Sequence, residues 1–283
     1  MIFDYQFRNY NFRALIYMIL LSVLGILVVG SASNQDRSSV IKQIIGVVVS
    51  LIICLVLSLI DYHQYFRFTT LIYVVCAGML AAVLLFGRTT KGATRWLRIG
   101  GIQIQPSEFV KIGLILILAN FLSRNREKIN EPKTLGMTAL ICVLPVGMVY
   151  LQPNLSTTIV ICFMILCMVY VAGISYKWIA GAVAVGVPGF AALIYLSLQG
   201  FIPFLQKYQA QRIMGKIFHS SSEFTDLNRQ QDNSMMAIGS GQLRGKGLFN
   251  NTLSSVKNGN FLSEEQTDFI FAVIGEELGF VGG

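Results

Sequence analysis

The clearest candidates for chemistry are carboxylates embedded in an apolar segment near residue 280. Residues 261–280, FLSEEQTDFIFAVIGEELGF, begin polar and continue as an apolar helical run. Asp268 stands at the start of that run, and Glu276 and Glu277 stand further along it. Acidic side chains are costly in lipid, so in such segments they usually mark a functional site. Capping of the helix by Thr267 or Asp268 is the alternative, since a carboxylate at a helix N-terminus is favoured by the helix dipole.

The two glutamates of this run need positive partners. Glu276 lies about 12 Å beyond Asp268 along a helix that rises 1.5 Å per residue, so both side chains can face one cavity without touching. Two buried acids without a cation would be strongly destabilising. We therefore expect basic side chains from other helices beside them, with Lys111 as the first candidate.

A second set of candidates lies in residues 91–112, KGATRWLRIGGIQIQPSEFVKI. Arg95 and Arg98 carry planar guanidinium groups suited to phosphate oxygens, and Trp96 suits the membrane interface. An amphipathic interfacial helix attracted to anionic lipid would explain the same residues. Glu108 and Lys111 stand three residues apart on one helix face. They either neutralise each other or line a ligand cavity.

Three weaker signals lie elsewhere in the chain. Gln152 belongs to LQPNLSTTIV, a polar interruption between apolar runs that turn chemistry alone explains well. Arg212 belongs to YQAQRI, which also suits a solvated loop. Lys246 belongs to IGSGQLRGKGLFNN, whose dense glycines indicate tight backbone turns close to a ligand or to a neighbouring helix.

The elements that must position these residues are membrane helices. Of the 283 residues, 54% are hydrophobic and only 13% are charged. Several apolar runs approach the roughly 20 residues that cross a bilayer. The sequence predicts an all-α fold, a polytopic transmembrane helix bundle with about eight spans. The spans cover residues 14–32, 43–60, 69–86, 109–121 (from Pro106 if Ser107 and Glu108 open the helix), 135–151, 155–172 and 178–198, and the last begins near residue 268.

Charge distribution predicts the orientation of these spans. Lys and Arg in the short loops favour a cytoplasmic N-terminus. This orientation places the basic loop 87–105 outside, against the usual rule, and an anionic ligand would explain the exception. Residues 199–267 then form a large extracytoplasmic loop. The net charge of +8 is spread over loops without a basic run, so nucleic-acid binding is not expected.

Five ordered blocks resemble the SEDS (shape, elongation, division and sporulation) family, the RodA/FtsW/SpoVE class. The blocks are GATRWLRIGGIQIQPSEFVKI (92–112), LQPNLSTTIV (151–160), YQAQRI (208–213), SMMAIGSGQLRGKG (234–247) and EEQTDFIFAVIGEELGFVG (264–282). The resemblance implies a single integral-membrane domain over 1–283 in the bacterial cytoplasmic (inner) membrane. It also implies a peptidoglycan glycosyltransferase that polymerises lipid II outside that membrane, with a class B penicillin-binding protein as partner.

The resemblance assigns roles to individual residues. Asp268 matches the family's essential carboxylate, and we expect it to act as general base on the 4-hydroxyl of the acceptor sugar. A divalent cation, Mg²⁺ or Mn²⁺, would suit one carboxylate together with substrate phosphates. The substrate-binding candidates are Arg95, Trp96, Arg98, Glu108, Lys111, Gln152, Arg212, Lys246, Glu276 and Glu277.

The chain departs from the family pattern in two respects. Asn154 and Ser156 stand where the family has Asp and Gly, which leaves the role of that turn open. The resemblance implies about ten spans, whereas this chain stops at Gly283 inside its eighth, which would be shorter than the roughly 20 residues of a full span, so we expect a C-terminally incomplete domain. A lipid-linked precursor transporter (flippase) and an inactive, truncated scaffold are the alternatives.

Overall fold

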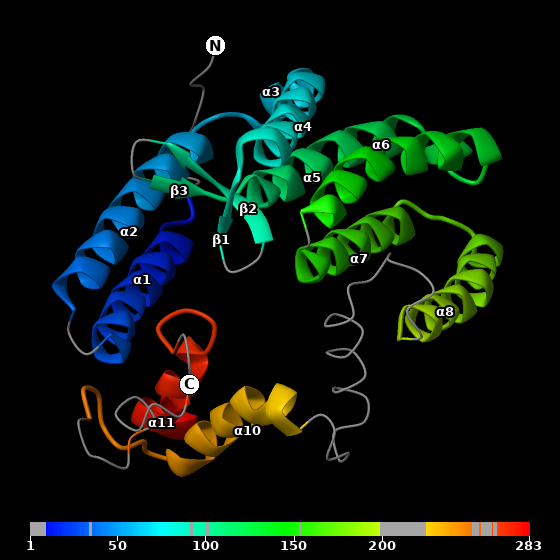
Figure 1. Ribbon diagram of the computed structural model, residues 1–283. Coiled ribbons are helices and arrows are strands. Elements are labelled where there is room, and N and C mark those ends of the chain that lie inside the picture. The colour runs from blue at the N-terminus through cyan, green and yellow to red at the C-terminus, as the bar shows by residue number, and fades with distance from the viewer. Residues whose placement is uncertain are drawn as a thin grey trace. The chain divides into compact units, whose positions relative to one another are not determined.

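Helices dominate the structure, a computed structural model (Figure 1). It describes residues 10–33, 36–90, 93–99, 102–152, 154–198, 225–250, 255, 262 and 265–283. The helices are α1 (Phe12–Ala32), α2 (Arg37–Ser58), α3 (Tyr62–Arg67), α4 (Thr69–Phe86), α5 (Pro106–Arg124), the short 3₁₀ helix η2 (Arg126–Lys128), α6 (Pro132–Leu151), α7 (Leu155–Val171), α8 (Tyr176–Leu198), α10 (Thr225–Ser240) and α11 (Ile270–Gly282). The chain divides into two compact units, residues 61–205 and residues 1–60 with 206–283.

The predicted all-α membrane fold is confirmed. Each apolar run predicted to span the membrane before residue 199 forms a helix, with ends within three residues of those predicted except at the start of α2, which lies six residues earlier. In the part of the chain that the structure describes, five helices are long and apolar enough to cross a bilayer, and α7 is a shorter apolar helix. The protein is therefore a multi-pass membrane protein. The single domain over 1–283 and the external position of 199–267 stay predictions.

Helix α5 is the centre of the unit formed by residues 61–205. It contacts α4, α6 and α7, and its buried side chains recur every three or four residues, as expected for one helical face. Leu114 and Leu118 are almost fully buried there against Leu80 of α4 and Ile161 of α7. The first turn of α5 begins at Pro106, as the Pro-Ser-Glu sequence predicted.

Residues 88–90, 93–99 and 102–104 form a small antiparallel sheet at the start of α5. Its strands are β1 (Arg88–Thr90), β2 (Ala93–Ile99) and β3 (Ile102–Ile104), in the order β1-β2-β3. The central strand β2 contacts both α4 and α5. The alternative of an interfacial helix is therefore wrong, because hydrogen bonds between neighbouring strands satisfy this segment's backbone.

In the other unit, α1 and α2 contact each other, and α11 contacts α10 and α1. Asp36 starts α2 by accepting hydrogen bonds from the backbone N–H groups of Ser38 (3.3 Å) and Ser39 (3.0 Å). The Ser39 hydroxyl also donates to this carboxylate and is the main reason that the pKa of Asp36 is lowered. Many apolar side chains of α1 and α2 are exposed, as expected of surfaces that face lipid.

Gly113 provides a test of the packing between α4 and α5. A Cβ atom at this position would lie 2.9 Å from the Cys76 sulfur. We expect Gly113→Leu to lower the free energy of unfolding by about 1–3 kcal/mol through overpacking. The measurement is thermal unfolding in detergent.

The matched control is Gly136→Leu in α6, where a Cβ atom would meet nothing within 4 Å. This variant should unfold close to the wild-type temperature. Adding Cys76→Ala to Gly113→Ala should recover stability lost by Gly113→Ala alone. Equal destabilisation by Gly113→Leu and Gly136→Leu would contradict the close packing of Gly113 against Cys76.

Candidate active site

Helix α11 carries two of the predicted acidic residues and is broken near its end. Gly279 has φ 68° and ψ −169°, which lies outside the helical region. In an uninterrupted helix the carbonyl oxygens of Glu276 and Glu277 would accept from the N–H groups four residues on, at Phe280 and Val281. The break at Gly279 frees both carbonyls and both N–H groups, and each needs a new partner.

The glycine-rich loop 241–250 supplies these partners. The N–H groups of Lys246 and Gly247 donate to the carbonyls of Glu276 and Glu277, each at 2.9 Å. In return, the N–H groups of Phe280 and Val281 donate to the carbonyls of Gln242 (2.9 Å) and Leu243 (3.1 Å). Four hydrogen bonds between loop and helix thus take the place of two within the helix.

Glycine is required where the loop meets the helix. Gly245 and Gly279 both have positive φ, 74° and 68°. A Cβ atom on either one would clash with backbone atoms of the other segment. The glycines predicted to lie close to a ligand or a neighbouring helix therefore lie against a helix, and that helix is α11.

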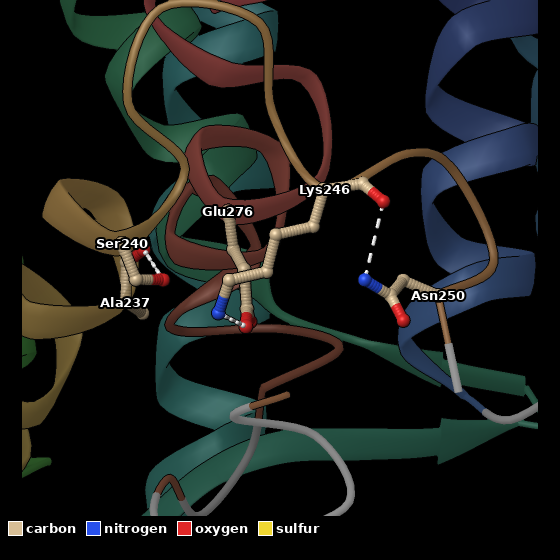
Figure 2. A network of polar contacts seen from close by, with 5 residues as sticks. All are labelled: Ala237, Ser240, Lys246, Asn250 and Glu276. Atoms are coloured by element: carbon tan, nitrogen blue, oxygen red, sulfur yellow. Dashed lines mark hydrogen bonds and ion pairs between the residues drawn. The ribbon is translucent and has the colours of Figure 1, made fainter. Parts of the chain in front are cut away.

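The carboxylate of Glu276 is buried and paired with Lys246. The Lys246 ammonium donates to Glu276 Oε1 at 2.7 Å, and the Asn250 amide donates to the Lys246 carbonyl at 3.2 Å (Figure 2). The cation described beside this acid is Lys246 of the loop, whereas Lys111, the expected partner, is paired with Glu108. The general requirement for a cation beside the buried acid is met.

Glu277 is equally buried and joins α11 to α1 and to the loop. The Ser31 hydroxyl of α1 donates to Glu277 Oε1 at 2.6 Å, and the Phe249 N–H donates to Oε2 at 3.3 Å. The sequence did not reveal Ser31, because 246 positions separate it from Glu277 and no motif surrounds it. The buried positions of Glu276 and Glu277 favour a structural role over their predicted contact with substrate.

Asp268 lies in a different environment from these two acids. It is exposed and belongs to the turn that leads into α11. Phe269 occupies the N-cap position of α11, and no side-chain hydrogen bond caps the helix. The alternative that Thr267 or Asp268 is the N-cap is therefore wrong, and the predicted helix start at residue 268 moves to Ile270. This exposed carboxylate is in a position to meet a ligand.

The basic and aromatic candidates lie on and beside β2 in the 61–205 unit. Side chains alternate along this strand, so Arg95 and Leu97 are half-buried while Trp96, 36% exposed, points the other way. Arg98 pairs with Gln103 in the ladder between β2 and β3. Near the start of α5, Lys111 and Glu108 form an ion pair of 2.8 Å. The ion pair agrees with mutual neutralisation, and the alternative that the two residues line a ligand cavity stays a prediction.

Gln152 and Asn154 lie at the ends of two consecutive helices. Gln152 is buried at the C-cap of α6 and donates to the Leu80 carbonyl at 3.3 Å. Asn154 is the N-cap of α7 and accepts from the Thr157 N–H at 3.4 Å. The Asn154 side chain therefore caps α7, and the Gln152 side chain links the end of α6 to α4. Arg212 lies outside the described residues.

A metal cage made by protein alone is not formed in the described ranges, which contain no group of three or more His, Cys, Asp or Glu residues placed to hold an ion. A single exposed carboxylate such as Asp268 fits another arrangement. In that arrangement one or two carboxylates share Mg²⁺ with the phosphates of a substrate.

Residues 12–283 match the sequence profile of the FtsW/RodA/SpoVE family of cell cycle proteins. The chain belongs to this family. It is 35% identical over 270 residues to the peptidoglycan glycosyltransferase MrdB of Escherichia coli K12, covering 95% of this chain and 69% of the relative. It is 32% identical over 281 residues to a probable peptidoglycan glycosyltransferase FtsW of Shewanella sediminis, covering 95% of this chain and 65% of the relative.

Solved structures share the SEDS fold. A chain of a peptidoglycan synthase complex, whose structure describes the coordination of polymerization and crosslinking, matches with a TM-score of 0.72 at 25% identity, over 97% of this chain and 73% of that one. The rod shape determining protein RodA of Thermus thermophilus matches with a TM-score of 0.63 at 24% identity, over 98% of this chain and 70% of that one. The RodA likeness shows the fold alone.

The ion pair between Lys246 and Glu276 offers a test of this SEDS site. Lys246→Met would leave the Glu276 carboxylate buried without its cation. We expect the variant to lose about 3 kcal/mol of stability. The Lys246, Gly247, Phe280 and Val281 amides should exchange hydrogen faster, as measured by hydrogen–deuterium exchange in detergent.

The matched control is Arg244→Met, which removes an exposed cation from the same loop. It should leave exchange at those four amides unchanged. The double variant Lys246→Met/Glu276→Gln should recover part of the loss, because no buried charge remains unpaired. Similar hydrogen exchange rates at these amides in Lys246→Met and Arg244→Met would show that the ion pair does not hold the loop against α11.

Proposed function

We propose that this chain is a peptidoglycan glycosyltransferase that polymerises lipid II at the outer face of the cytoplasmic membrane. The observation that carries the proposal is the contrast between the acids around α11. Glu276 and Glu277 are buried and engaged, whereas Asp268 is exposed at the entrance to the helix. The 35% identity to a peptidoglycan glycosyltransferase supports the reaction class.

The reaction joins two lipid-linked glycans. Asp268 takes the proton of the acceptor sugar's 4-hydroxyl, directly or through a water. The hydroxyl oxygen forms a bond to the anomeric carbon of the donor. The bond between that carbon and the pyrophosphate oxygen breaks, and the departing lipid pyrophosphate keeps the electron pair. An exposed carboxylate suits this role because both the sugar and the proton must reach it.

The leaving pyrophosphate needs positive charge placed in advance. Arg95 and Arg98 on β2 and Arg212 are the proposed donors. Lys111 is already paired with Glu108, so its charge is largely neutralised and its contribution is smaller. Trp96, exposed on the same strand, offers an aromatic face to a sugar ring or to the membrane interface.

A divalent cation is the proposed cofactor, and Asp268 is the residue that would hold it, with substrate phosphates as further ligands. Such an ion would neutralise charge that develops on the leaving group. Removal of metal with EDTA should lower glycan formation about tenfold or more, and Mg²⁺ or Mn²⁺ should restore it. Full polymerisation by demonstrably metal-free protein would contradict this role.

The orientation and the partner also belong to the proposal. A cytoplasmic N-terminus would place loop 87–105 and its arginines outside, on the side where lipid II polymerisation occurs. We propose a class B penicillin-binding protein as the crosslinking partner. The likeness to a chain of a complex that coordinates polymerization with crosslinking supports this choice.

The decisive variant is Asp268→Asn, which removes the base and keeps the shape of the side chain. Glycan formation from lipid II should fall about 100-fold or more, while binding of lipid II should be retained. The measurement is gel analysis of glycan strands made by the chain with a class B partner, beside a separate lipid II binding assay.

Gln266→Ala is the matched control, because Gln266 is exposed in the same turn and lacks a carboxylate. It should make wild-type amounts of glycan. Unchanged polymerisation by Asp268→Asn would overturn the assignment of the base. Lipid II movement across vesicles without polymerisation would favour a transporter. Partner binding in the absence of any product, while a longer relative succeeds in the same assay, would favour a scaffold.

A further inference from the structure

A groove in the 61–205 unit lies where α5 and α7 end, at the opposite end of α5 from Glu108 and Lys111. Its volume is about 400 Å³. One wall comes from α5 and the other from α7 and the residue that follows it. Ala119, Leu122 and Ser123 line the first wall, and Cys167, Met168, Val171 and Ala172 line the second.

Arg126 of η2 is the charged residue that lines this groove. Its side chain is exposed and makes no hydrogen bond or ion pair with any residue that the structure describes. The surrounding segment 124–133, RNREKINEPK, contains four cations and two carboxylates. The groove therefore has largely apolar walls with a guanidinium and excess positive charge at one end.

The position of the groove suits a lipid. Helix α5 is long and apolar enough to span the bilayer, so its end falls near the level of the headgroups. Basic pockets between membrane helices bind anionic lipid headgroups, and apolar walls cover acyl carbons. The exposed ends of α5 and α7 carry partial negative charge from their last carbonyls. A small anion alone would therefore bind poorly, and the acyl chain and Arg126 are both needed.

We propose that this groove binds an anionic phospholipid of the membrane, with an acyl chain between α5 and α7 and the phosphodiester at Arg126. The groove shares no lining residue with those proposed for glycan transfer. It would fix the ends of two core helices by occupying the space between them.

The test uses the full chain, freed of lipid in detergent, with binding measured by native mass spectrometry. Phosphatidylglycerol should bind more tightly than phosphatidylcholine of the same chains, and inorganic phosphate should not compete. Arg126→Gln should weaken phosphatidylglycerol binding about fivefold or more. Ala119→Leu, which partly fills the groove, should weaken it as well.

Arg124→Gln is the matched control, because Arg124 is an exposed cation of the same segment that does not line the groove. The affinity of this variant for phosphatidylglycerol should stay within about twofold of wild type. Asp268→Asn should also bind normally, so failure of this proposal is distinguishable from failure of the proposed function. Equal loss in Arg124→Gln and Arg126→Gln, or equal binding of phosphatidylcholine, would overturn the site. Tighter binding of a polyprenyl phosphate would overturn the choice of ligand.

A crosslinking experiment on the wild-type protein tests the same site even if the variants do not fold. Phosphatidylglycerol with a photoreactive acyl chain should crosslink within residues 119–126 or 167–172. Crosslinks confined to other helices would contradict the proposal.

Discussion

Two adjacent carboxylates buried in α11 impose the constraint on which the surrounding structure depends. A buried charge that loses its partner destabilises a protein by several kcal/mol, so Glu276 and Glu277 must be satisfied wherever the helix lies. Lys246 forms an ion pair with Glu276. The Ser31 hydroxyl and the Phe249 N–H donate hydrogen bonds to Glu277. Because these partners come from loop 241–250 and from α1, the two acids tie three separate segments together. The break at Gly279 adds backbone hydrogen bonds to the same junction.

The contacts at this junction distinguish the structural acids, Glu276 and Glu277, from the candidate catalytic acid, Asp268. An acid that is enclosed and bonded on several sides has little freedom to exchange protons with a substrate, whereas an exposed carboxylate can approach one. Glu276 and Glu277 fit the first description and Asp268 fits the second. The three residues stand within ten positions of one another and share an apolar segment, yet the structure gives them unlike surroundings. Holding α11 firmly would in turn keep the turn that carries Asp268 in place.

The parts of the structure that could be predicted are those governed by local pattern. Apolar runs such as 69–86 became helices with the predicted ends, and Pro106 began α5, because length, hydropathy and helix-start residues are local properties. The features that the sequence did not predict depend mostly on contacts between residues far apart in the chain. Ser31 meets Glu277 only in the folded chain, and Lys246 replaces Lys111 because the loop folds back on α11. The strands of residues 88–104 were missed because their residues also suit an interfacial helix.

Asn154 shows how a departure from a family pattern can be weighed by structure. The family has Asp where this chain has Asn, so one carboxylate is lost from the turn. The side chain serves as the N-cap of α7, and Asn and Asp are about equally good at that position because either oxygen accepts from the first turn. The substitution therefore preserves the start of the helix and changes only the charge. Any catalytic contribution from a carboxylate at this position would be absent here, which leaves Asp268 as the exposed acid on which the proposed proton transfer rests.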